Sequence, residues 1–356
     1  MKQLIDPSEV YVINLARDKE RWNKVSQECA RVGIIPKRVE AIYGKDLTEQ
    51  QVKEVTTKSC FENCTRSMIG CWLSHLSVWR KMVSQGIQQA LILEDDSSFV
   101  DDLGPKLAVV EQELSSLDDT PDLIFVGHTM SCEGGDCTFF ARMARFFATV
   151  SRTNGGEYTK VTEHLFRPSY IYGCIGYVVT LQGARKLIDL LPLADGHVDM
   201  EISRKIGSLD VLGVTPQLVI SRSTSSSSTQ NFSFPSNANT LLDRAFEQNG
   251  TGLGFMLSQP SGQVKNYAIN GWTGIFFLIG ISIMLATYSS HSSHSSGRLK
   301  VIIATLLTVW LGSEYLTTPN QSTRVQLAGS IAMIGLGYGA AVAVKKLAHS
   351  CDLIED

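Results

Sequence analysis

Short apolar runs and helical segments alternate along the first 220 residues of the chain. Short apolar runs are typical of buried strands, and apolar residues that recur every three or four positions are typical of amphipathic helices. The predicted strands are 10–14, 39–42, 90–93, 122–126, 170–180 and 211–220. The predicted helices are 18–32, 47–55, 67–85, 106–117 and 182–191. This alternation predicts an α/β domain with a mainly parallel sheet and helices on both of its faces.

The pattern changes after residue 268, where long apolar segments replace the alternation. Residues 269–288 carry no charged side chain over about 20 residues, the length that a tilted helix needs to cross a bilayer. Two more apolar segments follow at 301–316 and 327–344, and the last is rich in Gly and Ala, as packed membrane helices often are. Buried core helices are the alternative, but three in succession with almost no amphipathic face favour about three transmembrane helices.

The chain is therefore divided into four predicted parts. These are an α/β domain at 1–225, a polar linker at 226–268, a transmembrane region at 269–346 and a tail at 347–356. The N-terminus shows no apolar signal segment, so we expect a multi-pass membrane protein whose N-terminal domain is cytosolic. The distribution of basic residues beside the predicted spans mildly favours the opposite orientation.

Charge and cysteine content narrow the function classes. The chain has 32 Lys and Arg against 35 Asp and Glu, a net charge of −3, which argues against a nucleic-acid-binding surface. Cys60, Cys64 and Cys71 lie close together in the sequence. A CxxxC spacing without a second cysteine or histidine pair is a weak zinc signal, so ordinary free cysteines are favoured there.

The most informative polar stretch is LILEDDSSFV at 91–100, where an apolar run leads directly into Glu94, Asp95 and Asp96. If the strand continues to Asp96, its period of two places Glu94 and Asp96 on one face and Asp95 on the other. Paired carboxylates at a strand end suit a hard cation such as Mg²⁺ or Mn²⁺, which neutralises a departing diphosphate. The alternative is an acidic strand end that caps the next loop.

His75 lies on the predicted helix 67–85, three and four positions from Trp72 and Trp79. It is either a hydrogen-bonded core histidine or a side chain that holds the acidic loop. A structural or supporting role is favoured for it.

Five motifs together resemble glycosyltransferase family 25, whose members include bacterial lipooligosaccharide and procollagen galactosyltransferases. They are YVINLARDKERW (11–22), GCWLSHLSVWRKMV (70–83), ALILEDDSSFV (90–100), YIYGCIGYVVTLQGARKLIDLL (170–191) and HVDMEI (197–202). The resemblance covers roughly 9–225. It implies a GT-A-like fold, a nucleotide-sugar donor such as UDP-galactose or UDP-glucose, and inversion at the anomeric carbon. The predicted C-terminal spans depart from the family pattern, and 128–168 contain no family motif.

The resemblance also implies roles for individual residues. Those matching its donor-binding motifs are Asn14, Leu15, Arg17, Arg21, Ser74, His75 and Asp95. An arginine at the start of a helix can pair with phosphate, although a solvated helix face is the alternative for both arginines of this set.

The remaining roles concern the metal and the base. Asp96 is the expected main ligand of Mn²⁺ or Mg²⁺, Glu94 assists it, and His197 could ligate the metal instead, as a late histidine does in other GT-A enzymes. Asp199 is the candidate base that takes the proton of the acceptor hydroxyl, because inverting transfer requires one.

These inferences predict a membrane-anchored inverting glycosyltransferase that moves galactose or glucose from a UDP-sugar to a glycan, lipid-linked or protein acceptor. A catalytically inactive nucleotide- or sugar-binding module on a membrane scaffold is the alternative, and a small membrane protein regulated by its N-terminal domain is a third. Transport is disfavoured, because Glu314 is the only acidic residue within the predicted spans and has no evident basic partner.

Overall fold

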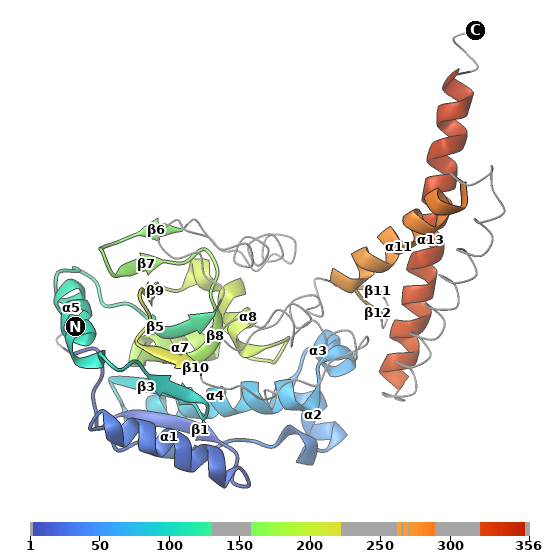
Figure 1. Cartoon of the computed structure of the whole chain (residues 1–356). Coiled ribbons are helices and arrows are strands. Elements are labelled where there is room, and N and C mark those ends of the chain that lie inside the picture. Colours follow the sequence, from blue (N-terminus) through green and yellow to red (C-terminus); the bar gives the residue numbers. More distant parts are fainter. Residues whose placement is uncertain are drawn as a thin grey trace. The chain divides into compact units, whose positions relative to one another are not determined.

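The computed structural model describes residues 3–129, 158–221, 262–264, 267–269, 271–288 and 321–352. The chain divides into two compact units, which are coloured along the sequence in Figure 1. The first comprises residues 1–231 and 247–251, and the second comprises 232–246 and 252–356. The predicted linker lies mostly outside the described residues, so the predicted domain boundaries stay predictions.

An eight-stranded sheet forms the centre of the N-terminal unit. In order across the sheet, its strands are β2 (Lys37–Glu40), β1 (Val10–Asn14), β3 (Gln89–Glu94), β8 (Tyr172–Thr180), β5 (Leu123–Thr129), β9 (Val211–Val214), β7 (Leu165–Arg167) and β6 (Thr159–Lys160). Strand β1 is parallel to β2 and β3, and β5 is parallel to β9. The pairs β3–β8, β5–β8, β7–β9 and β6–β7 are antiparallel.

The sheet is therefore mixed, and the prediction of a mainly parallel sheet is wrong. Strand β8 is almost wholly buried at the centre of the sheet and runs opposite to both of its neighbours. A strand covered on both faces has the same apolar pattern in either direction, so this pattern does not reveal its orientation.

Helices cover both faces of the sheet, and alternate residues of each strand supply two separate cores. Tyr11 and Ile13 of β1 belong to the core beneath α4 (Arg66–Gln85), α7 (Leu181–Leu190) and α8 (Val198–Arg204). Val10 and Val12 belong to the core beneath α1 (Lys19–Arg31) and α5 (Leu103–Ser115). The remaining helical segments of this unit are η1 (Gly44–Asp46), α2 (Glu49–Val55), α3 (Lys58–Asn63) and η2 (Ile206–Ser208).

Local signals set several element boundaries. Thr48 and Gln51 form the predicted capping box at the start of α2, and α4 ends at Gly86, whose φ of 67° is in the left-handed region. The predicted strand 211–220 is interrupted at Pro216, which has no backbone N–H to donate. Its second half is β10 (Val219–Ser221), which pairs with β4 (Ser97–Phe99) directly after the acidic residues.

Cys60 and Cys64 form a disulfide with a Cα–Cα distance of 4.6 Å. The prediction of free cysteines is therefore wrong for this pair, because one turn of α3 brings the two residues within bridging distance. Cys71 is a free cysteine.

The described part of the C-terminal unit contains two helices, α11 (Gly271–Tyr288) and α13 (Gln321–Asp352), and a hairpin of β11 (Gly262–Val264) and β12 (Tyr267–Ile269). The two helices pack backbone to backbone at Gly280 and Gly337. A Cβ on Gly280 would lie 1.9 Å from the carbonyl oxygen of Ile334, and one on Gly337 would lie 2.0 Å from that of Phe277.

Among the described residues, the structure contains no helix that combines the length and the apolar character needed to cross a bilayer. The predictions of a transmembrane region and of a multi-pass membrane protein are therefore wrong. The predicted span 301–316 lies outside the described residues.

Candidate active site

A pocket forms where the parallel strands β1, β2 and β3 end at the same edge of the sheet. Ile13 is in register with Glu94, and Asn14 with Glu40, so the segments that follow these strands meet there. The cavity has a volume of about 140 Å³. It is lined by Ile13, Asn14, Leu15, Arg17, Arg21, Ala41, Ile42, Tyr43, Gly44, Lys45, Ser67, Cys71, Ser74, His75, Glu94, Asp95 and Asp96.

The loop after β2 forms one wall of the pocket and lies directly on α4. A Cβ on Gly44 would lie 1.6 Å from the carbonyl oxygen of Arg66, and one on Gly70 would lie 2.4 Å from that of Ile42. The Ser74 hydroxyl accepts a hydrogen bond from Ile42 N at 2.8 Å and donates one to Gly70 O at 2.6 Å. Ser74 therefore fixes the wall of the pocket.

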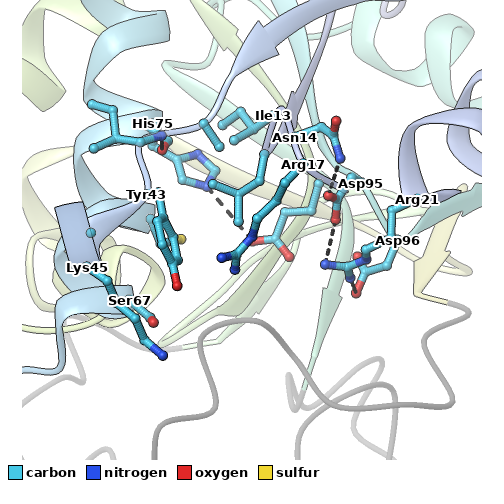
Figure 2. Close-up of a pocket in the computed structure, with 17 residues that line it drawn as sticks. Ile13, Asn14, Arg17, Arg21, Tyr43, Lys45, Ser67, His75, Asp95 and Asp96 are labelled. Carbon is cyan, nitrogen blue, oxygen red and sulfur yellow. Dashed lines mark hydrogen bonds and ion pairs between the residues drawn. The ribbon is translucent and has the colours of Figure 1, made fainter. Parts of the chain in front are cut away.

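The acidic residues occupy a turn at the end of β3. The strand ends at Glu94, so a strand that continues to Asp96, the condition for placing Glu94 and Asp96 on one strand face, is not found. Arg21 of α1 reaches both of the following carboxylates, as Figure 2 shows. Its Nη1 lies 2.8 Å from Asp95 Oδ1, and its Nη2 lies 3.2 Å from Asp96 Oδ2.

Asp95 is held on a second side by the end of β1. Asn14 Nδ2 donates to Asp95 Oδ2 at 2.7 Å, and Arg38 Nη2 donates to Asn14 Oδ1 at 2.6 Å. Burial raises the pKa of Asp95, although Arg21 and the hydrogen bond from Asn14 act in the opposite direction. Both oxygens of this carboxylate have protein partners, so Asp95 links the first helix and strand to the acidic turn.

Asp96 differs, because its Oδ1 atom is buried without a hydrogen-bond partner. Burial and the neighbouring charge of Glu94 raise the pKa of Asp96 to about 6. The Glu94 side chain is 35% exposed and lines the same pocket. Two nearby carboxylates, one with an unsatisfied buried oxygen, are a donor set that fits a hard divalent cation.

His75 bridges the core and the pocket. Its Nδ1 lies 2.9 Å from Tyr177 Oη, and Trp79 Nε1 donates to the same oxygen at 3.0 Å. Which of Tyr177 Oη and His75 Nδ1 donates in this contact depends on the histidine tautomer, and the tautomer protonated at Nδ1 leaves a lone pair on Nε2. That nitrogen, His75 Nε2, is buried, has no hydrogen-bond partner and lies 3.9 Å from Glu94 Oε1.

Arg17 stacks on Tyr43 at the wall formed by the loop after β2. The guanidinium carbon lies 3.8 Å from the centre of the ring, and Figure 2 shows Arg17 beside Tyr43 at the pocket. The Arg17 side chain is 55% exposed, so its donors are accessible from the pocket. Leu15 also lines this wall, and its carbonyl oxygen accepts a hydrogen bond from Arg38.

Among the described residues, those that line the pocket do not include His197 or Asp199. Both oxygens of Asp199 accept backbone hydrogen bonds, from Gly173 N at 2.8 Å and from Met200 N at 2.9 Å. Gly173 has a φ of 80°, a left-handed conformation that glycine adopts without strain. Burial lowers the pKa of His197, and the charges of Asp199 and Glu94 oppose this shift.

The residues at or beneath the pocket that the sequence did not predict include Arg38, Tyr43 and Tyr177, and Cys71 was considered only for a weak zinc signal with Cys60 and Cys64. Tyr43 directly follows the predicted strand 39–42, and residues beyond strand ends are where α/β sheets bind ligands. Cys71 could have been found from its i,i+4 spacing to His75, which places the two side chains on the same face of the helix. No local pattern marks Arg38 or Tyr177.

Comparisons with known proteins identify relatives of the N-terminal unit. A "Glycosyltransferase 25 family member" of Aedes aegypti is 28% identical over 200 residues, which cover 54% of this chain and 30% of that protein. Procollagen galactosyltransferase 1 of Danio rerio is 28% identical over 193 residues, 52% of this chain and 29% of the relative. The "Probable inactive glycosyltransferase 25 family member 3" of Bos taurus is 26% identical over 195 residues, 52% of this chain and 29% of the relative.

The chain thus spans less than a third of the length of these curated relatives. The family model described as "Glycosyltransferase family 25 (LPS biosynthesis protein)" matches residues 8–201, more than half of the 356-residue chain. The matched segment contains the three strand ends, the acidic turn and Asp199. The chain belongs to glycosyltransferase family 25.

Proposed function

We propose that the N-terminal unit transfers a hexose, galactose or glucose, from a UDP-sugar to a hydroxyl group of a glycan, lipid-linked or protein acceptor. The acceptor oxygen forms a bond to the anomeric carbon, the bond from that carbon to the diphosphate oxygen breaks, and the configuration inverts. The observation that carries the proposal is the pair Glu94 and Asp96 in a pocket that the exposed Arg17 also lines, with Asp96 Oδ1 buried and without a hydrogen-bond partner.

Glu94 and Asp96 are the residues that would hold Mn²⁺ or Mg²⁺. The fit rests on their oxygen donors and on the buried Oδ1 of Asp96, which has no partner. A bound divalent cation would neutralise the charge of the departing nucleoside diphosphate. Since His197 is absent from the described residues lining the pocket, Glu94 and Asp96 are the favoured ligands of the sequence-predicted set.

The donor would bind along the ends of β1 and β2. Arg17 presents an exposed guanidinium that can pair with a phosphate, and Tyr43 holds it in place by stacking. Arg21 is already engaged by Asp95 and Asp96, so its role is to position the acidic turn. Asn14 has the same role through Asp95.

Asp199 is the proposed base. The negative charges of Asp199 and Glu94 both act to raise the pKa of His197, so both carboxylates lie close enough to His197 to interact with it electrostatically. The backbone hydrogen bonds from Gly173 and Met200 fix the orientation of the Asp199 carboxylate. In the transfer, it would accept the proton of the attacking hydroxyl group.

A catalytically inactive nucleotide- or sugar-binding module is the second candidate. The observation that favours it is the name of the bovine relative, a probable inactive family member. The acidic turn of this chain argues for activity, because three carboxylates packed close together repel one another in the absence of a ligand.

The test is a measurement of UDP release by the full chain from UDP-galactose and UDP-glucose, with and without Mn²⁺, together with thermal shifts by UDP. We expect metal-dependent UDP release from at least one of the two donors. A thermal shift by UDP without release would support the inactive module. Absence of both release and shift would overturn both candidates.

The base is tested separately. Asp199→Asn should lose most of the turnover while UDP still binds, and Asp189→Asn, an exposed substitution of the same kind, should not. If Asp199→Asn kept full turnover while Asp96→Asn abolished it, Asp199 would not be the base.

A further inference from the structure

Helix α4 presents two metal-binding side chains to the pocket. Cys71 and His75 are four positions apart, so they lie one above the other on the same helix face, and both line the cavity. Cys71 is a free thiol, whereas nearby Cys60 and Cys64 are bonded to each other.

Glu94 supplies a third ligand atom from the end of β3. The Cys71 Sγ, a His75 ring nitrogen and a Glu94 carboxylate oxygen lie within 4.8 Å of one another. His75 Nε2 and Glu94 Oε1 are 3.9 Å apart, too far for a hydrogen bond. Ligand atoms around a tetrahedral zinc ion are about 3.3 to 3.6 Å apart, given metal–ligand distances of about 2.0 to 2.3 Å. Small side-chain movements would therefore bring all three atoms around one ion.

The imidazole is already oriented for such an ion. Tyr177 Oη engages His75 Nδ1, and Trp79 Nε1 holds the same oxygen. His75 is fully buried, and its Nε2 is directed towards Glu94 with no hydrogen-bond partner. An unpaired polar atom in a buried position is costly unless a ligand satisfies it. A metal-bound histidine usually donates the N–H of its second ring nitrogen to a partner, so a metal ion on Nε2 selects the tautomer in which Nδ1 donates to Tyr177 Oη.

We propose that Cys71, His75 and Glu94 form a binding site for a borderline transition-metal ion, with Zn²⁺ as the favoured class. A set of thiolate, imidazole and carboxylate ligands suits zinc, whereas Mg²⁺ and Mn²⁺ prefer oxygen ligands. Three protein ligands leave the fourth tetrahedral position open to the pocket. This site differs from the pair Glu94 and Asp96 proposed for the hard cation, and it does not depend on the transferase proposal.

The two donor sets share Glu94, which has a consequence for any activity of the pocket. A zinc ion on Cys71 and His75 would take Glu94 away from Asp96. Zinc should therefore compete with Mn²⁺ instead of replacing it.

The first experiment uses Co²⁺, a spectroscopic substitute for Zn²⁺, with the full chain and without reductant. We expect a cobalt–thiolate charge-transfer band and the visible bands of tetrahedral Co²⁺. Cys71→Ser should abolish the charge-transfer band and weaken Co²⁺ binding at least tenfold. The matched control is Cys29→Ser, which removes another free buried thiol in the core on the other face of the sheet and should keep the band.

A second measurement requires no variant. Alkylation of Cys71 in the wild-type chain, followed by mass spectrometry, should slow at least tenfold when Zn²⁺ is added and recover with a chelator. An unchanged cobalt band in Cys71→Ser, or alkylation of Cys71 at the same rate with and without Zn²⁺, would overturn the site. Neither readout depends on a UDP-sugar, so failure of the site is distinguishable from failure of the transferase proposal.

Discussion

The two sides of the pocket differ in how completely their polar atoms are paired. The arginine side consists of Asn14, Arg21, Arg38 and Asp95, and both oxygens of its buried carboxylate have protein partners. The histidine side consists of Cys71, His75 and Glu94, where the buried His75 Nε2 has no partner. Asp96 shares a feature of each side, because one of its oxygens faces Arg21 and the other is unpaired.

This difference separates structural roles from ligand-binding roles. A paired buried network contributes to stability, and breaking it leaves an uncompensated charge. An unpaired buried polar atom costs roughly 1 to 3 kcal/mol in the free protein, and a ligand that satisfies it recovers this energy. We therefore expect substitutions on the arginine side to change the free energy of unfolding, and those on the histidine side to change metal binding.

Asp96→Asn should have the largest effect, a fall in UDP release of about 100- to 1,000-fold, because it removes a charged ligand of the proposed cation at the reacting diphosphate. UDP release from the UDP-sugar in Mn²⁺ measures it. Asp119→Asn, at an exposed loop position, is the matched control and should retain activity. Full activity of Asp96→Asn would remove Asp96 from the proposed site.

Arg21→Met should lower the free energy of unfolding by roughly 2 to 4 kcal/mol at pH 7, because it leaves Asp95 buried with its charge unpaired. Urea denaturation measures the change. Asp95 has a raised pKa and becomes neutral in acid, so the cost should shrink as the pH falls towards 4.

The control for this prediction is Lys24→Met, which breaks the exposed pair with Glu20 on the same helix. Exposed pairs contribute little, so it should change stability by less than about 1 kcal/mol. Equal effects of Arg21→Met and Lys24→Met would contradict the structural role of the arginine side.

Glu201→Gln tests a second buried carboxylate that is paired with arginine, here Arg204. Burial raises the pKa of Glu201 from 4.5 to about 7, so the folded state holds this proton more tightly than the unfolded state does. The free energy of unfolding of the wild type should therefore fall as the pH rises from about 4.5 to 7. Relative to the wild type, Glu201→Gln should be more stable at pH 8 than at pH 5 by about 2 kcal/mol or more.

Unfolding at pH 5 and at pH 8 measures this difference between Glu201→Gln and the wild type. The exposed Glu54→Gln should show no comparable pH dependence. A variant that is equally destabilised at both pH values would show that the pair with Arg204 outweighs the burial of Glu201.

Tyr177→Phe should have the smallest effect, a loss of about 1 to 2 kcal/mol of stability, because one hydroxyl group beneath His75 is removed. On the histidine side, it should also weaken Co²⁺ binding about tenfold, since His75 loses the partner that orients its ring. A cobalt titration measures the second effect. A loss of stability without any change in cobalt binding would show that Tyr177 contributes to stability but does not orient His75 for metal binding.

The sequence predicted much of the N-terminal fold and several pocket residues. The alternating patterns identified β1, β3, α4 and the acidic turn, and the family motifs led to Asn14, Arg21 and His75. The direction of β8 escaped prediction, because burial on both faces gives one pattern for either orientation. The apolar segments after residue 268 were overinterpreted, because apolar composition alone does not specify both the length and the continuity of a helix.

The sequence by itself determined that the chain is an α/β protein of this family with carboxylates at a strand end, because periodicity and short motifs are local properties. Only the tertiary structure decided that both oxygens of Asp95 are paired and that Asp96 Oδ1 is not. Arg21 and Asp95 are separated by more than 70 residues, as are Tyr177 and His75. Hydrogen-bond pairing is set by distances of about 3 Å between atoms that only folding brings together, so no local pattern contains it.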